Sequence, residues 1–425
     1  MSLTIKSQNR IKTKRYRLLL LAVFLFPILP QFIYLIGPIN TVNFNVISVI
    51  GLFAIIGKFP TKKVYKALPL FWIYELFCTF YYLFDDGIVK AISWLFSFVM
   101  IPYLVVCTID TQKRFYTVID ALILGGTILD IFGIAEELLK FNIFQQFAPA
   151  GYDFFAYNYR YGLLRIMTSF GQPIGYGIYQ VFVIALIFYR LGSNINQKNK
   201  TILKVFCILS VINVLLTVSR TPTIMLILFV VIELFQTTKE SKVKRFLIIL
   251  IVLISMIFIK ETFSISVPFI DDITNSIQSL GEGNHTDSTT TGFGQRFELL
   301  YWVIASMNGR WFLGKGIAAA FSYKVNDWQT KTSIENGYLD LFYRTGIIGV
   351  VLYCSMMLGN IRLLFKNKKI KLPNEKKSFY RIICSVFVLY LIALFGVQET
   401  DMTRMFVVFV SLIISYKRIY SRAYI

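Results

Sequence analysis

The sequence is a succession of apolar runs separated by short segments rich in lysine and arginine. Most of these runs approach the roughly 20 residues that an α-helix needs to cross a bilayer. Only 16% of the residues are charged, whereas a soluble domain has about 25%. We therefore predict an all-α, polytopic membrane protein, with residues 1–425 forming a single membrane domain of about twelve transmembrane helices.

The expected spans follow the apolar runs, and flanking polar residues complete the shorter helices. In chain order they are Leu18–Ile36, Val42–Ile56, Leu68–Phe84, Ile88–Ile109, Tyr116–Leu139, Ile174–Leu191, Ile202–Val218, Thr221–Phe235, Phe246–Ile259, Tyr338–Leu364, Phe379–Val397 and Met402–Tyr416. An even number of spans puts both termini on the same side of the membrane.

The basic residues decide which side that is. The net charge is +21, but the cations are spread over short loops, which argues against a nucleic-acid-binding domain. If the N-terminus is inside, 31 of the 44 lysines and arginines lie in inner segments: 1–17, 58–66, 113–114, 190–204, 239–245, 362–381 and 417–422. The positive-inside rule then predicts that both termini are cytoplasmic.

Two long loops face outward in this topology, at 140–173 and 260–337. The second contains "SLGEGNHTDSTTTGFG", a Gly/Ser/Thr-rich segment that is typical of a flexible loop and holds the only histidine, His285. It is followed by "QRFELLYWVIASMNGRWF", residues 295–312, where Phe297, Leu300, Tyr301, Ile304 and Ala305 recur at helical spacing. This pattern predicts an amphipathic helix that can lie at the membrane surface.

Several arginines would gather on the outer side. Arginine suits a phosphate group because its planar fork donates two parallel hydrogen bonds and keeps its proton. A single arginine near the interface is more often explained by snorkelling to the membrane surface. Arg220 is different, because "TVSRTP" puts it in a very short turn between two apolar runs, and there we favour a functional role. The outer arginines are Arg160, Arg165, Arg220, Arg296, Arg310 and Arg404, with Arg344 about two turns into its helix.

Carboxylates are available on the same side. One of them could act as the general base toward a hydroxyl group, although an ion pair with one of the outer arginines is the better explanation for most of them. The candidates are Asp153, Glu298, Glu335, Asp340, Glu399 and Asp401.

Four local patterns occur in order along the chain. They are "RIMTSFGQPIGYG" at 165–177, "TVSRTP" at 217–222, "GQRFELLYWVIASMNGRWFLGKGIA" at 294–318 and "ENGYLDLFYRTGIIG" at 335–349. In this order and topology the chain resembles the bacterial O-antigen polymerase and ligase superfamily. The resemblance covers about residues 160–350 and rests on the combination of the patterns, since each alone is weak.

The resemblance assigns roles to residues that match the family pattern. An arginine-led segment before a turn matches Arg165, a Ser-Arg at the end of a span matches Arg220, and an arginine before an amphipathic helix matches Arg296. The ligases carry a His-Asn followed by nine residues and GxxG, and the spacing holds from Asn336 onward. Glu335 replaces the histidine, which favours a polymerase over a ligase.

The resemblance implies a C-type glycosyltransferase architecture in the bacterial cytoplasmic membrane. The implied reaction joins undecaprenyl-diphosphate-linked glycan donor and acceptor outside that membrane. Arg165, Arg220 and Arg296 would bind the diphosphate, Arg220 and Glu335 would be catalytic, and neither a metal nor another cofactor would be needed. Membrane lipids, and a chain-length regulator and flippase of the same pathway, are the partners expected.

Two other functional classes stay open at this point. A flippase for lipid-linked oligosaccharides would use a similar number of spans, but it would be expected to show two related halves and polar residues near the midplane of the bilayer. A receptor or assembly partner would need no pocket of acids and arginines. Turnover by the purified protein separates an enzyme from both.

Overall fold

The computed structural model describes residues 2–30, 32–36, 39–56, 67–82, 100–148, 159–160, 163–193, 195–235, 293–326, 329–365, 374–398 and most of 408–419. These residues are mostly helical, and the strands are confined to three two-stranded hairpins. Expected spans that fall largely outside this range, at Ile88–Ile109 and Phe246–Ile259, therefore stay predictions.

The helices follow most of the predicted runs. In chain order the elements are α1 (Ser2–Ile28), β1 (Tyr34–Ile36), β2 (Ile39–Asn40), α2 (Thr41–Ile56), α3 (Ala67–Tyr81), α5 (Ile101–Thr108), α6 (Gln112–Leu139), η2 (Ile143–Phe147), β3 (Tyr159–Arg160), β4 (Leu163–Leu164), η3 (Thr168–Phe170), α7 (Pro173–Leu191), α8 (Gln197–Leu216), α9 (Arg220–Phe235), α12 (Phe293–Ser306), β5 (Tyr323–Asn326), β6 (Gln329–Lys331), α13 (Gly337–Phe365) and α14 (Asn374–Ala393).

Four of the described helices contain segments that are long and apolar enough to cross a membrane. These segments are Gln112–Leu139, Pro173–Leu191, Gln197–Leu216 and Gly337–Met357. The shorter apolar helix in α3 exposes Leu70, Ile73, Phe77 and Phe80. Exposed apolar faces of this kind are expected where lipid covers a protein. The chain is therefore a helical membrane protein, and the predicted number of about twelve spans stays a prediction.

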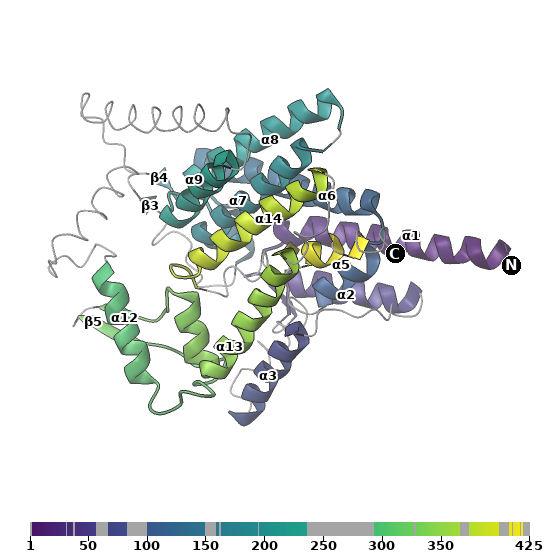
Figure 1. Ribbon diagram of the computed structural model, residues 1–425. Coiled ribbons are helices and arrows are strands. Elements are labelled where there is room, and N and C mark those ends of the chain that lie inside the picture. Colours follow the sequence, from purple (N-terminus) through teal and green to yellow (C-terminus); the bar gives the residue numbers. More distant parts are fainter. Residues whose placement is uncertain are drawn as a thin grey trace, which may run out of the picture.

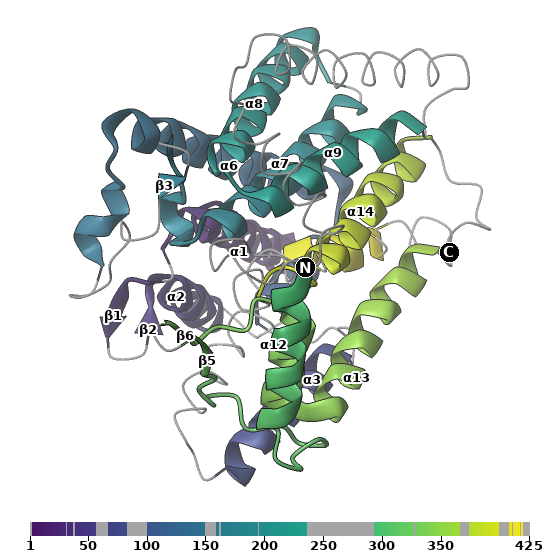
Figure 2. The same cartoon turned by 90° about the vertical axis from the view of Figure 1, so that its left-hand side faces the viewer.

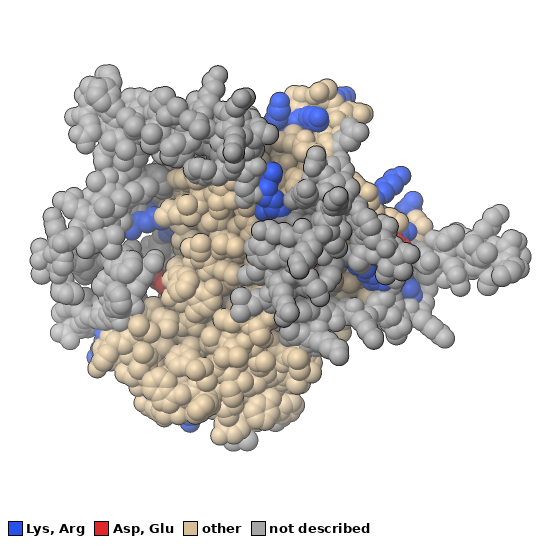
Figure 3. Space-filling view, in the orientation of Figure 1, with Lys and Arg blue, Asp and Glu red and all other residues tan. Residues whose placement is uncertain are grey.

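The helices form two groups (Figures 1 and 2). In the larger group α7 packs against α6, α8, α9 and α14, and α1 packs against α6 and α2. In the smaller group α13 packs against α3 and α12. α14 also touches α13, and it joins the two groups. The smaller group is almost free of charged side chains on the face seen in Figure 3, and the blue basic groups lie mainly over the larger group.

Two predicted spans are wrong in detail. The first helix ends at Ile28 instead of continuing to Ile36, and residues 34–36 form the strand β1. Pro30 explains the early end, because the residue before a proline is disfavoured in helical conformation. The tenth span is not one continuous helix, because Gly346 has φ 66° and ψ −171° and breaks α13 there.

The two long loops that are predicted to face outward carry local structure. The first contains η2, the β3–β4 hairpin and η3. In the second, α12 ends at Ser306, earlier than the predicted Phe312. Its buried stripe is Leu299, Val303 and Met307, which pack in a small core with residues of the β5 region and α13. Leu300, Tyr301 and Ile304 of the predicted apolar stripe are exposed.

Candidate functional site

A three-residue turn places Arg220 at the start of α9. Thr217, Val218 and Ser219 join α8 to α9, so the connection is as short as the sequence predicted. Val218 has φ 47°, which is costly for a β-branched residue and requires surroundings that hold the turn. The Thr217 amide donates to the Asn213 carbonyl at 3.1 Å, and the Ser219 hydroxyl donates to the Thr217 carbonyl at 2.9 Å. The backbone that precedes Arg220 is therefore held in one conformation.

Arg165 contacts the same turn from the segment that precedes α7. Its Nε donates to the Thr217 carbonyl at 3.3 Å, and one terminal nitrogen donates to the Ser219 hydroxyl at 2.9 Å. The Ile166 amide also donates to the Leu216 carbonyl at 3.4 Å. The structure thus brings Arg165 to the residue directly before Arg220, although 54 positions separate Arg165 from Ser219 in the chain.

The start of α7 approaches the start of α9 so closely that only a glycine fits on α7 beside this turn. A Cβ atom added to Gly177 would lie 2.7 Å from the side chain of Pro222, closer than real Cβ atoms approach a neighbour. Pro222 stands in the first turn of α9, where a proline is tolerated because its missing N–H has no helical partner. The glycine and the proline together let the starts of α7 and α9 meet.

Glu136, which the sequence interpretation did not select, positions the Arg165 segment. It lies near the end of α6 and is buried. Its carboxylate accepts hydrogen bonds from the Thr168 amide at 2.9 Å, the Met167 amide at 3.3 Å and the Asn142 side chain at 3.1 Å. A buried carboxylate is stable only when its oxygens are hydrogen-bonded in this way. The sequence did contain a signal for Glu136, because a carboxylate at the end of an apolar run is a candidate for a functional or structural role.

A second polar network, also missed, lies behind the turn. The Ser210 hydroxyl donates to the Asp130 carboxylate at 2.7 Å, and the Asn213 amide donates to the Asp130 carbonyl at 3.1 Å. The Tyr176 hydroxyl donates to the Asn213 side chain at 2.9 Å. All four side chains are buried. The network joins α6, α7 and α8, the helices that carry the Arg165 segment and the turn, so it fixes their relative positions.

The third and fourth sequence patterns also meet in space. The Lys315 amide donates to the Tyr343 carbonyl at 2.8 Å, and the Ile347 amide donates to the Trp311 carbonyl at 2.9 Å. A Cβ atom on Gly314 would lie 2.6 Å from the Gly346 nitrogen. The glycines at both positions therefore let the segment after α12 sit in the break of α13.

Arg344 belongs to this scaffold. Its Nε donates to the Asp340 carboxylate at 2.8 Å, and another nitrogen donates to the Ile317 carbonyl at 2.6 Å. The ion-pair explanation therefore applies to Asp340.

Glu335 lies exposed directly before α13. Its neighbour Asn336 caps this helix, since its side-chain oxygen accepts from the Tyr338 amide at 3.0 Å and the Leu339 amide at 3.1 Å. The Gly337 amide donates to the Leu394 carbonyl at 2.7 Å, just after the end of α14. The chain at Glu335 is thus fixed at the junction of α13 and α14. Because α14 also packs on α9 and α7, it connects this junction to the helix that begins at Arg220.

The structure places the other predicted site residues only in part. Arg296 lies on α12, but its side chain is outside the described part of the protein, so its convergence with Arg220 stays a prediction. The same holds for the side chain of Glu298. Outside the described residues altogether are Asp153, His285, Glu399, Asp401 and Arg404. Within the described ranges, His, Cys, Asp and Glu nowhere gather in a group that could hold a metal ion.

Comparison with protein families matches residues 205–354 to the O-antigen ligase family. The matched region runs from within α8 to within α13 and includes both the Arg220 turn and the Glu335–Gly349 pattern. No curated protein matches the chain. The family match agrees with the resemblance of the four sequence patterns, and it places residues 205–354 of this chain in the O-antigen ligase and polymerase superfamily.

Proposed function

We propose that the protein is a polymerase that joins undecaprenyl-diphosphate-linked oligosaccharide repeats into a surface polysaccharide at the outer face of the cytoplasmic membrane. The observation that carries the proposal is the fixed pairing of Arg165 with Ser219, beside Arg220. Arg165 is thereby held at the turn that carries Arg220, so two arginines from separate parts of the chain lie at the same turn. Such a pair suits a diphosphate.

In the proposed reaction the arginines act on the leaving group. An acceptor hydroxyl oxygen attacks the anomeric carbon of the donor sugar and forms the new glycosidic bond. The bond between that carbon and the phosphate oxygen breaks, and undecaprenyl diphosphate leaves with the electron pair. Arg220, braced by Arg165, would stabilise the negative charge that develops on the diphosphate, and Glu335 would take the proton of the acceptor hydroxyl.

The alternative with a specific observation behind it is a ligase that transfers the glycan to another acceptor molecule, because the matched family is described as O-antigen ligase. Glu335 at the position of the ligase histidine favours the polymerase. The two activities differ in product. A polymerase extends one lipid-linked glycan by several repeats, whereas a ligase moves the glycan to a second acceptor.

The test is to incubate the purified protein in lipid nanodiscs with its lipid-linked repeat alone and to separate the products on a gel. A ladder of glycans differing by one repeat supports the polymerase. Absence of a ladder, with transfer only after a separate acceptor is added, supports the ligase instead. Absence of both, in a preparation that keeps its thermal unfolding transition, contradicts the proposal.

A further inference from the structure

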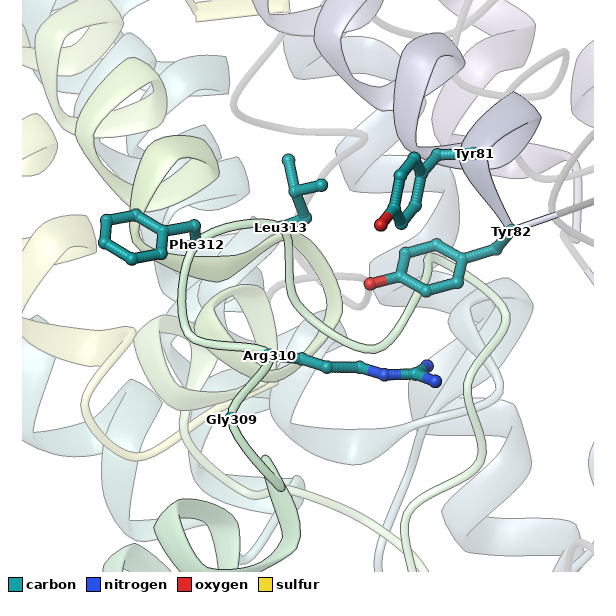
Figure 4. Close-up of a pocket in the computed structure, with 6 residues that line it drawn as sticks. All are labelled: Tyr81, Tyr82, Gly309, Arg310, Phe312 and Leu313. Carbon is teal, nitrogen blue, oxygen red and sulfur yellow. The ribbon is translucent and has the colours of Figure 1, made fainter.

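A separate recess lies between the end of α3 and the segment that joins α12 to β5 (Figure 4). Its volume is about 480 Å³, and it is lined by Tyr81, Tyr82, Gly309, Arg310, Phe312 and Leu313. This volume lies within the range of small-molecule sites in proteins. None of the lining residues belongs to the diphosphate site proposed above, so the recess needs its own explanation.

Arg310 supplies the charge of this recess. Its guanidinium lies over the ring of Tyr82, 5.3 Å from the ring centre, and its side chain is exposed (Figure 4). Among the described residues no carboxylate forms an ion pair with Arg310. A guanidinium that lies over a ring still presents N–H groups that can donate hydrogen bonds to a ligand.

Tyr82 is itself fixed in place. Its hydroxyl donates to the Gly314 carbonyl. A Cβ atom on Gly316 would lie 3.2 Å from the ring, so the backbone approaches the ring closely there. The Gly316 amide donates to the Arg344 carbonyl at 3.0 Å, which ties this segment to α13. The orientation of Arg310 over Tyr82 therefore rests on a rigid backbone.

An exposed aromatic ring completes the recess. Tyr81 is 59% exposed. The ring of Tyr81 meets that of Tyr82 edge-on, with centroids 5.1 Å apart, and both hydroxyls point toward the segment that carries Leu313 (Figure 4). A sugar ring has an apolar face of C–H groups that packs on an aromatic ring. Its hydroxyls, and any carboxylate it carries, accept hydrogen bonds from arginine.

We propose that this recess binds one sugar ring of the oligosaccharide repeat, with Tyr81 as the packing surface and Arg310 as the hydrogen-bond donor. The identity of the glycan rests on the proposed function, but the site uses none of Arg165, Arg220 or Glu335. Aromatic and basic residues also gather at membrane interfaces to meet lipid headgroups. Contact with a mobile headgroup requires no rigid support. The backbone beside this recess is instead held in a specific conformation, with φ 74° at Gly314 and φ 66° at Gly346.

The test measures binding of a probe that lacks both lipid and diphosphate. The probe is the water-soluble oligosaccharide released by mild acid from the lipid-linked repeat, and its dissociation constant is measured by equilibrium dialysis against the full-length protein. Arg310→Gln and Tyr81→Ala should each weaken binding about 10-fold, because the first removes the charged hydrogen-bond donor and the second removes the aromatic packing surface. Tyr81→Phe keeps the ring and should retain binding. Arg160→Gln and Tyr159→Ala, on β3, are the matched controls.

The outcomes separate this site from the polymerase proposal. Weaker probe binding in Arg310→Gln and Tyr81→Ala, with Arg220→Lys binding like the wild type, supports the sugar site even if no polymer ladder forms. Unchanged binding in the two variants, or no binding to the wild type, overturns the sugar site even if a ladder does form. Loss of co-purifying phosphatidylglycerol in Arg310→Gln, with oligosaccharide binding unchanged, would identify a lipid headgroup site and also overturn it.

Discussion

The guanidinium of Arg165 donates a 2.9 Å hydrogen bond to the hydroxyl of Ser219, one residue before Arg220. This contact connects the segment before α7 with the turn between α8 and α9. It means that the position of Arg220 depends on a loop that is remote in the sequence.

Replacing Arg220 by lysine tests the bidentate role of its guanidinium. Arg220→Lys keeps the charge but cannot donate two parallel hydrogen bonds to a diphosphate. We expect polymer formation to fall about 10- to 100-fold, as for the loss of a charged hydrogen bond, at unchanged membrane abundance. The measurement is the polymer ladder beside the amount of protein in the membrane, with Arg160→Lys as the control. Full activity in Arg220→Lys would show that charge alone suffices. Full activity in Arg220→Ala would show that Arg220 has no role in the reaction and only snorkels to the membrane surface.

A double-mutant cycle on Arg165 and Ser219 tests whether the bond between them positions Arg220. Arg165→Gln and Ser219→Ala should each reduce polymerisation, and the double variant should lose less than the two effects added together. The expected coupling is about 0.5–1.5 kcal/mol, the usual contribution of one hydrogen bond. Rates measured at saturating donor supply the cycle. Strictly additive effects would mean that Arg165 acts without its bond to Ser219.

Glu335→Gln tests the proposed general base. Glutamine keeps the size and one acceptor oxygen, but it cannot take the acceptor proton. A general base contributes about 100- to 10,000-fold to a rate, so the turnover number should fall within that range while the apparent donor affinity is kept. Asn336→Asp is a useful companion, because aspartate still caps α13 and should preserve the fold. Equal rates and polymer lengths in Glu335→Gln and the wild type would assign Glu335 a non-catalytic role.

Three glycine substitutions test the packing of α13. Gly346→Ala combines a positive φ with a clash against the backbone of Phe312, and we expect it to cost at least the roughly 1–3 kcal/mol of a strained backbone position. Gly309→Ala has φ 78° but open space, so it measures the conformational term alone. Gly51→Ala lies in α2 with nothing within 4 Å and should be neutral or stabilising by about 0.5–1 kcal/mol. Midpoints of thermal unfolding in detergent should therefore fall in the order Gly51, Gly309, Gly346.

Cysteine labelling tests the predicted orientation. Ser333 and Lys198 are both exposed and lie in an outer and an inner segment of the predicted topology. In a variant without the five native cysteines, Ser333→Cys should react with a membrane-impermeant maleimide on intact cells, and Lys198→Cys should react only after lysis. The reverse labelling pattern would invert the topology and place Arg220 on the cytoplasmic side.

Sequence alone determined the helical membrane class, because apolar runs of bilayer length leave the backbone few alternatives to helices. It also located the turn at Arg220, since "TVSRTP" interrupts two such runs. The end of α1 was not predicted correctly from the sequence, because Pro30 ends the helix although the residues after it are apolar. Hydropathy predicts one continuous helix over residues 338–364. It could not reveal that the helix is broken at Gly346, where the segment at Gly314 packs against it.

What only the tertiary structure decided is which remote groups meet. The buried hydrogen bonds of Glu136 fix the Arg165 segment, Arg344 pairs with Asp340 one turn earlier on α13, and the Arg310 recess exists because α3 reaches the end of α12. Local patterns carry helix periodicity and charge, which act over a few residues and can be read along the chain. The partners of a buried carboxylate or an arginine lie tens to hundreds of residues away, and their selection depends on packing that no local pattern encodes.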